Sequence, residues 1–226
     1  MENSVRIIEV KRNIMSKNEE EAQKLREELA EKGIFLINVM SSPGSGKTST
    51  LTKLINMLKD ELKIAVIEAD IDSDVDARTI AELTGVKAIQ LHTGGGCHVE
   101  ANMTAESLKA LGAGDMDVVF LENIGNLVCP AAFDTGASKN LTILSVPEGD
   151  DKPLKYPGMY RICDLVVLNK IDVLPYFDFD TEKFAEYIKI RNPKAVILPI
   201  SAKTGEGVDK LADWVRREVA EFRASR

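Results

Sequence analysis

The sequence predicts an α/β fold in which helices cover both faces of a mainly parallel sheet. Short apolar runs without polar alternation recur along the chain, and segments of helical periodicity separate them. Such runs are typical of parallel sheets, because the crossover helices bury both faces. A glycine-rich loop joins the first run to the following helix. With 226 residues, the chain has the size of one domain, which we expect to span residues 1–226.

The composition argues against several other classes of protein. Hydrophobic residues make up 44% and charged residues 29% of the chain, as in folded globular proteins. No apolar run approaches the ~20 residues of a membrane-spanning helix, and charges occupy the N-terminus where a signal peptide is apolar. We therefore expect a cytoplasmic protein without a membrane partner. A net charge of -7 also disfavours nucleic acid as a partner.

The first element is expected to be an amphipathic helix over about residues 5–32. Its apolar positions recur at steps of three, four and seven: Ile8, Met15, Ala22, Leu25 and Leu29. Gly33 would end this helix. Its apolar face could pack on the sheet of its own chain or reach a partner, and we favour the first.

The remaining elements alternate along the chain. Apolar runs predict strands over residues 34–40, 64–68, 88–91, 117–122, 141–146, 164–169 and 195–200. Helical periodicity predicts helices near residues 47–60, 74–85 and 98–111, between the later strands, and over 208–222. This βαβα order predicts parallel strands joined by helical crossovers.

A phosphate-binding loop is predicted where the first strand meets the next helix. Residues 41–48 read Ser-Ser-Pro-Gly-Ser-Gly-Lys-Thr, so backbone N–H groups can face phosphate oxygens at a helix N-terminus. Ser41 stands where the usual G-x-x-x-x-G-K-S/T pattern has its first glycine. We expect Lys47 to reach the β- and γ-phosphates and Thr48 to ligate Mg²⁺. The expected phosphate-binding set is Gly44, Ser45, Gly46, Lys47, Thr48 and Ser49.

Two further motifs predict that the base is guanine. Residues 169–172 read Asn-Lys-Ile-Asp at the carboxyl end of a predicted strand, where open α/β sheets bind ligands. The Asp172 carboxylate can accept hydrogen bonds from N1–H and the 2-amino group of guanine. Asn169 would tie this loop to the phosphate loop, and the Lys170 stem would cover the purine. After the next strand, backbone N–H groups could meet the guanine carbonyl from Ser201, Ala202 and Lys203.

Carboxylates near the phosphate loop are candidates for holding Mg²⁺ and supporting hydrolysis. Glu122 ends a predicted strand, and Gly125 can offer a backbone N–H to the γ-phosphate. In the acidic loop after the second strand we favour Asp70 and Asp76 as Mg²⁺ or water ligands, although these residues could instead cap a helix. Asn126, not glutamine, follows Gly125, so we expect slow unassisted hydrolysis.

Cysteine and histidine offer a second kind of metal site. Cys97 and His98 are adjacent, and Cys129 follows Glu122 by seven residues. Thiolate and imidazole suit Zn²⁺ or Ni²⁺. A fourth ligand would come from water, from another side chain such as His92 or from a second chain; equally, the two cysteines could be core residues. Cys163 fits a packing role.

Together these motifs resemble the HypB family, the nickel-inserting GTPases of NiFe-hydrogenase maturation, over essentially the whole chain. The shared segments occur in the family's order: the loop 41–48, Gly96-Cys-His98, residues 122–130, Glu148-Gly-Asp150 and residues 169–172. The resemblance implies a P-loop NTPase fold of the SIMIBI type, and GTP, Mg²⁺ and Ni²⁺ or Zn²⁺ as ligands. It also implies that Cys97, His98 and Cys129 hold metal at or near the interface of a homodimer that GTP favours. A hydrogenase-maturation accessory protein and the hydrogenase large subunit are the implied partners.

Two departures from related patterns refine this expectation. The chain has neither an N-terminal Cys-x-x-Cys site nor a histidine-rich tract, which argues against nickel storage. The similar urease accessory GTPases carry a Cys-Pro-His motif where this chain has Cys129-Pro-Ala131, so we prefer hydrogenase as recipient. A metal carrier with a purely structural nucleotide and a P-loop kinase or ATPase remain the alternatives.

Overall fold

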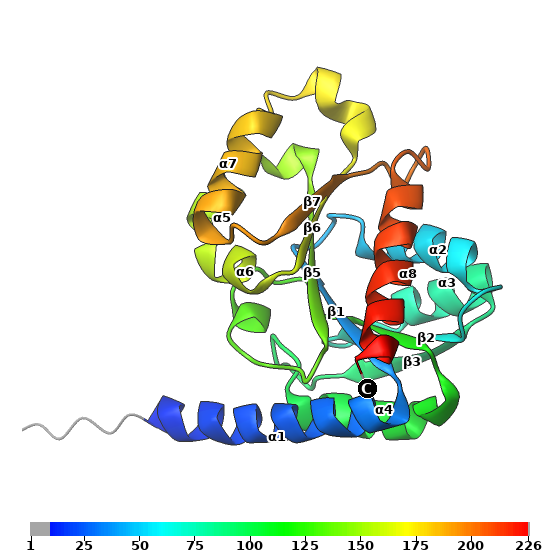
Figure 1. The fold of residues 1–226 in the computed structure, drawn as a ribbon. Coiled ribbons are helices and arrows are strands. Elements are labelled where there is room, and N and C mark those ends of the chain that lie inside the picture. The colour runs from blue at the N-terminus through cyan, green and yellow to red at the C-terminus, as the bar shows by residue number, and fades with distance from the viewer. Residues whose placement is uncertain (1–9, 226) are drawn as a thin grey trace, which may run out of the picture.

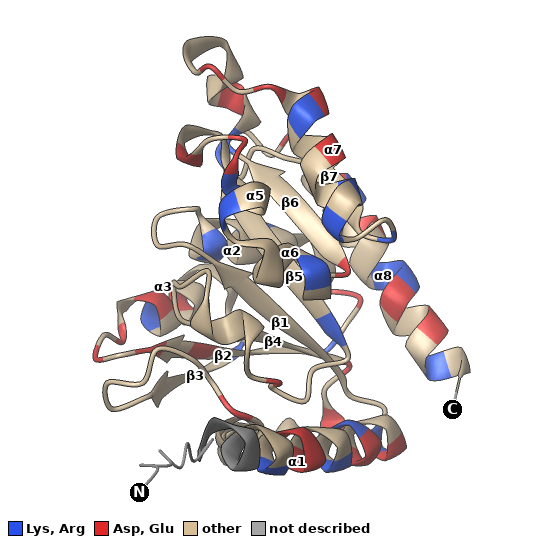
Figure 2. Ribbon diagram, turned by 90° about the vertical axis from the view of Figure 1, so that its left-hand side faces the viewer, with Lys and Arg blue, Asp and Glu red and all other residues tan. Residues whose placement is uncertain are grey.

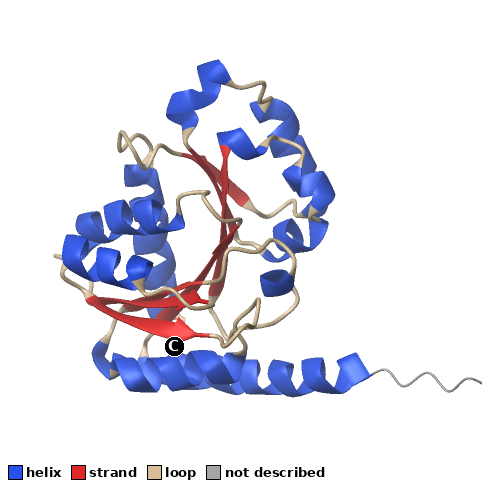
Figure 3. Cartoon of the chain, turned by 180° about the vertical axis from the view of Figure 1, so that it is seen from behind, coloured by secondary structure: helices blue, strands red, loops and turns tan. Residues whose placement is uncertain are grey.

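The computed structural model describes residues 10–225, and within them one sheet of parallel strands forms the centre of the fold (Figures 1 and 3). Its strand order is β3-β2-β4-β1-β5-β6-β7. All neighbouring strands pair in parallel, which confirms the predicted fold class. The strands are β1 (Phe35–Ser41), β2 (Ile64–Asp70), β3 (Lys87–His92), β4 (Val118–Glu122), β5 (Lys139–Ser145), β6 (Leu165–Asn169) and β7 (Val196–Pro199).

Helices cover both faces of this sheet, as Figure 3 shows. They are α1 (Val10–Lys32), α2 (Lys47–Leu58), α3 (Val75–Thr84), α4 (Ala101–Leu111), α5 (Lys152–Lys155), α6 (Pro157–Ile162), α7 (Thr181–Arg191) and α8 (Val208–Ala224). Short 3₁₀ segments are η1 (Ala113–Asp115), η2 (Cys129–Ala131), η3 (Val146–Glu148) and η4 (Ile171–Tyr176). Within residues 10–225 no helix is long and apolar enough to cross a membrane.

The core has two sides because side chains of a strand alternate between its faces. On β1, Phe35 and Ile37 belong to a buried cluster that includes residues of α2 and α8. Leu36, between them, belongs to a cluster that includes residues of α1 and α4. Every residue of β1 is buried, as expected for a central parallel strand. A third cluster joins the sheet to α6 and α7.

The N-terminal helix packs on its own chain over the residues described. Leu25 and Leu29 lie in the same buried cluster as Leu36 of β1 and Leu108 of α4, and acidic and basic residues recur along the helix between its apolar positions (Figure 2). The favoured packing on the chain's own sheet is thereby observed for the part of α1 that contains Leu25 and Leu29. The expected start near residue 5 and the apolar position Ile8 lie outside the described residues.

Helix α4 begins later than the sequence predicts. Its first residue is Ala101 rather than His98, because Glu100 has extended backbone angles of φ -98 and ψ 165. The side chain of Asn18, on α1, accepts the hydrogen bond of the Ala101 N–H at 2.9 Å. Cys97 and His98 therefore lie in the loop before α4 and not on the helix.

Candidate functional site

Two adjoining cavities open beside the carboxyl ends of the strands. One, of about 670 Å³, is lined by Lys47, Glu68, Asp76 and Glu122 among others. The other, of about 570 Å³, is lined by Asn169, Asp172, Ala202 and Lys203 among others. Both share Gly46, Thr48, Ser49, Thr79 and Lys170. Most of the expected phosphate and base residues therefore line these two adjoining cavities, where open α/β sheets bind ligands, whereas Ser45 and Ser201 line neither.

The loop between β1 and α2 requires glycine at Gly46. Its φ is 96°, in the left-handed region that disfavours other residues. A Cβ placed there would lie 2.5 Å from Nδ2 of Asn169, so the two loops approach too closely for a side chain. The backbone N–H groups beyond Gly46 begin α2 at Lys47 and lie where an anion would bind.

Ser41 supports this loop with its hydroxyl. Its Oγ accepts hydrogen bonds from Lys47 Nζ at 3.1 Å and from Ser45 Oγ at 2.7 Å. The side chain is completely buried. The residue that departs from the usual motif thus organises the loop from within, which the motif alone does not show.

Asn169 connects three loops around the two cavities. Its Nδ2 donates to the Ser45 carbonyl at 2.9 Å. Its Oδ1 accepts from the N–H of Lys170 at 2.8 Å and of Ala202 at 3.0 Å. The amide is 1% exposed, so these bonds form away from bulk water. The expected tie between the base loop and the phosphate loop is present in this geometry.

Asp172 and Lys170 are fixed by their own contacts. Ser201 Oγ donates to Asp172 Oδ1 at 2.6 Å, which orients the carboxylate beside the cavity. Lys170 Nζ donates to the Gly44 carbonyl at 2.7 Å, and its backbone has φ 63°. The stem of Lys170 therefore crosses between the two loops at the cavity edge.

Three carboxylates lie close together in the cavity beside the phosphate loop. Oxygen atoms of Glu68, Asp76 and Glu122 lie within 4.8 Å of one another, and Thr48 Oγ1 donates to Glu122 Oε1 at 3.1 Å. One oxygen each of Glu68 and Glu122 is buried without a hydrogen-bond partner in the described chain. Carboxylates of this kind, with a hydroxyl beside them, are ligands that suit Mg²⁺.

The electrostatics of this cluster favour a bound cation. Burial, followed by the charges of Glu68 and Asp76, raises the pKa of Glu122 to about 8, although the Lys47 ammonium, the largest influence after burial, acts to lower it. Burial and the charges of Asp76 and Asp70 raise the pKa of Glu68 to about 7. A divalent cation would offset the repulsion and favour the charged forms.

Glu68 is the member of this cluster that the sequence reasoning missed. The available signal was a carboxylate at the end of an apolar run, in a strand buried on both faces. The structure does not bring the favoured Asp70 into the cluster. Asp70 lines the same cavity, but its Oδ1 accepts from the N–H groups of Asp72 and Ser73 at 3.0 and 2.8 Å, which turns it toward its own loop.

Glu148, part of the Glu-Gly-Asp segment, supports the phosphate loop from the other side. Ser42 Oγ donates to one carboxylate oxygen of Glu148. The other oxygen accepts from Ser145 N and Oγ at 2.7 and 2.8 Å. No site role was assigned to this residue from the sequence, because the contact joins segments 106 residues apart.

The loop after β4 lies directly against the phosphate loop. A Cβ on Gly125 would be 3.0 to 3.2 Å from Cγ, N and Cα of Pro43. The next residue, Asn126, faces the cysteines: its Nδ2 donates to the Cys97 carbonyl at 3.4 Å, and its Oδ1 accepts from Cys129 N at 3.3 Å. A displacement of Gly125 would therefore be transmitted to both cysteine segments.

The structure places the two cysteines side by side. A hydrogen bond with the Cys129 thiol, followed by burial, raises the pKa of the Cys97 thiol. Cys97 Sγ lies 3.8 Å from His98 Nδ1. Cys129, Cys97 and His98 do not form a compact group with all ligand atoms within 4.8 Å in the described chain. Cys163, in contrast, is buried in the core, as expected from its sequence context.

The chain is similar to a known family of nucleotide-binding proteins. A model of the nucleotide-binding domain of CobW, HypB and UreG proteins matches residues 35–199. Hydrogenase maturation factor HypB of Rhizobium leguminosarum bv. viciae is 46% identical over 216 residues, which cover 95% of this chain and 72% of that protein. The chain belongs to the HypB family.

Solved HypB structures share the fold of this HypB-family chain. HypB from Helicobacter pylori in complex with nickel has a TM-score of 0.85 and 38% identity, covering 91% of this chain and 96% of that one. HypB from Archaeoglobus fulgidus has a TM-score of 0.84 and 36% identity, covering 90% of this chain and 99% of that one. The P-loop NTPase fold and the family resemblance found in the sequence are both confirmed.

Proposed function

We propose that this chain is a cytoplasmic GTPase that binds nickel and delivers it for NiFe-hydrogenase maturation. Residues 1–226 act as a single P-loop GTPase domain. The observation that supports this best is the pair of adjoining cavities, with Asn169 joining the phosphate loop to both base loops. The family relationship and the nickel complex of the Helicobacter pylori protein support the metal assignment.

The nucleotide would lie across both cavities. Gly44, Ser45, Gly46 and Ser49 would surround the phosphates, and Lys47 would exchange its bond to Ser41 for the β- and γ-phosphates. Asp172 would read guanine, Lys170 would cover the ring, and Ala202 and Lys203 would close the base cavity that they line, with Ser201 behind them bonded to Asp172.

Mg²⁺ fits the carboxylate cluster, whose buried partnerless oxygens would gain a ligand. Thr48, Glu122, Asp76 and Glu68 would hold it, directly or through water, as their proximity supports. When bound, the ion supplies charge neutralisation between the phosphates. Asp70 remains a candidate for the attacking water from its position in the same cavity. Gly125 would place its N–H near the γ-phosphate.

Nickel or zinc would be the cargo of Cys97, His98 and Cys129. Two thiols and an imidazole suit these borderline ions. Because one chain supplies three of these ligands, a second chain could complete the site, and we propose a homodimer that GTP strengthens. Sedimentation with GDP and with a non-hydrolysable GTP analogue tests this, since equal association in both states contradicts it. The proposed recipients are a maturation accessory protein and the hydrogenase large subunit.

Guanine specificity tests the nucleotide assignment. Calorimetry should show GTP binding far more tightly than ATP, and Asp172→Ala should remove that preference because the carboxylate bonds to guanine are lost. Asp178→Ala, at an exposed position of the following loop, serves as control and should leave it unchanged. Equal affinity of the unmodified protein for ATP and GTP would refute the GTPase assignment and favour an ATPase or kinase.

Metal binding and its link to the nucleotide are tested separately. In competition with a chelator, Cys129→Ala should weaken Ni²⁺ or Zn²⁺ binding by orders of magnitude, whereas Cys163→Ala removes a core thiol and should not. Nickel affinity should also differ between GDP and a GTP analogue by about 1–3 kcal/mol, the usual size of coupling between sites. The same affinity in both states would make the protein a carrier whose nucleotide is only structural.

A further inference from the structure

We propose that helix α1 positions the metal ligands, and that Asn18 is the positioning residue that holds their two segments together. The inference rests on the proposed function of Cys97, His98 and Cys129 as metal ligands. Cys97 and His98 lie in the segment that leads into α4 at Ala101, and Cys129 lies in the segment that leads to Asp134. Both segments reach α1 within a few residues of their ligands.

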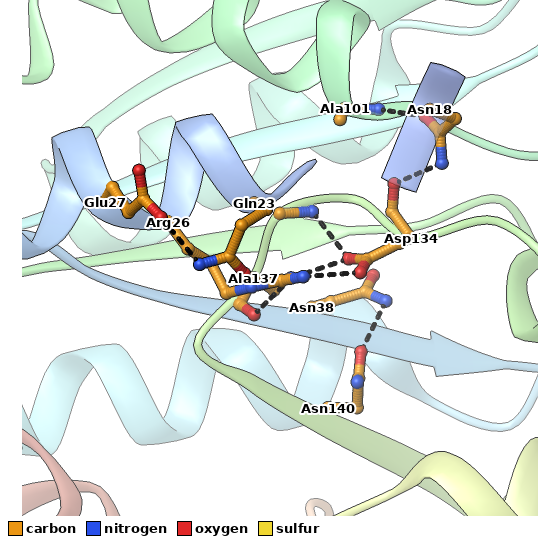
Figure 4. Close-up of polar contacts among 10 residues, drawn as sticks. Asn18, Gln23, Arg26, Glu27, Asn38, Ala101, Asp134, Ala137 and Asn140 are labelled. Carbon is orange, nitrogen blue, oxygen red and sulfur yellow. Dashed lines mark hydrogen bonds and ion pairs between the residues drawn. The ribbon is translucent and has the colours of Figure 1, made fainter. Parts of the chain in front are cut away.

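The Asn18 amide bonds to both segments at once. Its Oδ1 accepts from Ala101 N at 2.9 Å, and its Nδ2 donates to the Asp134 carbonyl at 2.9 Å. Figure 4 shows the side chain between the two groups. Asn18 is 4% exposed, and Glu100, the residue at the N-cap of α4, makes no side-chain cap bond there. Buried amides are retained where both donor and acceptor are used.

Arg26, two turns further along α1, reinforces the second of these contacts. Its Nη1 and Nη2 donate to Oδ1 and Oδ2 of Asp134 at 2.8 and 2.6 Å, a bidentate pair (Figure 4). The same loop approaches the helix so closely that a Cβ on Gly136 would lie 2.7 Å from Cδ2 of Leu25. The loop after Cys129 is thus attached to α1 by charge, by hydrogen bonds and by close packing.

These contacts extend to the ligand side chains. Phe133, next to Asp134, stacks on the His98 ring with centroids 3.6 Å apart and an interplanar angle of 16°. His98 Nε2 lies 3.4 Å from Glu100 Oε1, next to the residue that Asn18 holds. Fixing Ala101 and Asp134 therefore fixes the orientation of the imidazole. Outer contacts that orient metal ligands typically change metal affinity by about 10- to 100-fold when removed.

Asn18→Asp separates this role from helix stability. The carboxylate can still accept from Ala101 N, which keeps the N-terminus of α4 bonded, but it cannot donate to the Asp134 carbonyl. The new negative charge would by itself strengthen cation binding, so a loss of affinity can only come from geometry. Gln23→Glu adds the same charge to the same helix at an exposed residue whose side chain bonds to Glu27 within α1, and is the matched control.

The measurement is Ni²⁺ and Zn²⁺ affinity of the full chain by chelator competition, with the nickel–thiolate absorption band and GDP affinity recorded for each variant. We expect Asn18→Asp to weaken metal binding at least about tenfold and to change the absorption band, with GDP affinity unchanged. Gln23→Glu should match the unmodified protein. Metal affinity of Asn18→Asp equal to or above that of the unmodified protein would overturn the inference.

Failure of the proposed function gives a different result. If Cys129→Ala binds Ni²⁺ and Zn²⁺ as tightly as the unmodified protein, the ligand assignment fails and the positioning role of Asn18 fails with it. If Cys129→Ala loses metal but Asn18→Asp does not, only the positioning role is refuted.

Discussion

The carboxylate cluster leads to a stability prediction that depends on pH. Glu68→Gln removes a charge while keeping nearly the same shape, and we expect the metal-free protein to become more stable at pH 8 but not at pH 4.5. The pKa of Glu68 is raised from its ordinary 4.5 to about 7, chiefly by burial and then by neighbouring carboxylates. Ionising this group therefore costs the folded protein more than the unfolded chain.

The size of the effect follows from that difference. Each pKa unit corresponds to about 1.4 kcal/mol, so the rise to about 7 corresponds to about 3 kcal/mol. Water in the open cavity screens part of the charge, and we expect about 2 kcal/mol of added stability. Below pH 4.5 the carboxyl is protonated in both states and the gain vanishes. It grows as pH rises from 4.5 and is complete above about 7.

The assay is urea unfolding of Glu68→Gln and unmodified protein at pH 4.5 and pH 8, without divalent metal or nucleotide. Glu82→Gln, on the exposed face of α3, controls for the loss of one acidic residue. Adding Mg²⁺ and GDP should reverse the order at pH 8, because the variant lacks a carboxylate for the ion. Equal stability of the two proteins at pH 8 without metal, or an equal gain at both pH values, would refute the reasoning.

Three further predictions test neighbouring parts of the site. Magnesium affinity in the presence of GDP should fall as pH drops from 8 toward 7, because Glu122, whose pKa is about 8, must lose its proton when the ion binds. Calorimetry in buffers of different ionisation enthalpy should show this proton release. Magnesium binding without proton release would contradict the prediction. Gly125→Ala should destabilise the protein by about 1–3 kcal/mol and weaken GTP binding, because the new Cβ would press on the Pro43 backbone. An unchanged free energy of unfolding in urea together with an unchanged affinity for GTP would refute this prediction. Asn169→Ala should lower the free energy of unfolding in urea by about 3 kcal/mol, because the Ser45 carbonyl and two backbone N–H groups lose their partner. A decrease of less than about 1 kcal/mol would count against a stabilising contact among the three loops.

Much of the fold could be predicted because its physical signals are local. Continuous apolar runs identified every strand within a few residues of its observed bounds, and the glycine loop placed α2 correctly. The start of α4 was wrong because the deciding partner, Asn18, lies 83 residues away from Ala101 in the sequence. Periodicity describes a helix face but does not report a side chain that arrives from another helix.

The candidate site was predictable where a motif is contiguous and less so where residues converge from separate segments. Most phosphate-loop residues and Asn169, Lys170 and Asp172 line the two cavities, whereas Ser45 and Ile171 do not. Glu68 was missed because the sequence does not distinguish one strand carboxylate from another. Only the fold brings Glu68 close to Asp76 and Glu122. The role of Ser41 could likewise not be predicted, because it depends on the hydrogen bonds that its hydroxyl accepts from Lys47 and Ser45, which the motif does not indicate.

The segment from Gly125 to Asp134 is held at both ends, against Pro43 of the phosphate loop and against Arg26 of α1. The number of residues between these two anchors therefore determines where Cys129 lies. Inserting or deleting even one residue between those two anchors would shift Cys129 relative to Cys97. Homologous proteins that keep both anchors and Cys129 should therefore keep the number of residues between them.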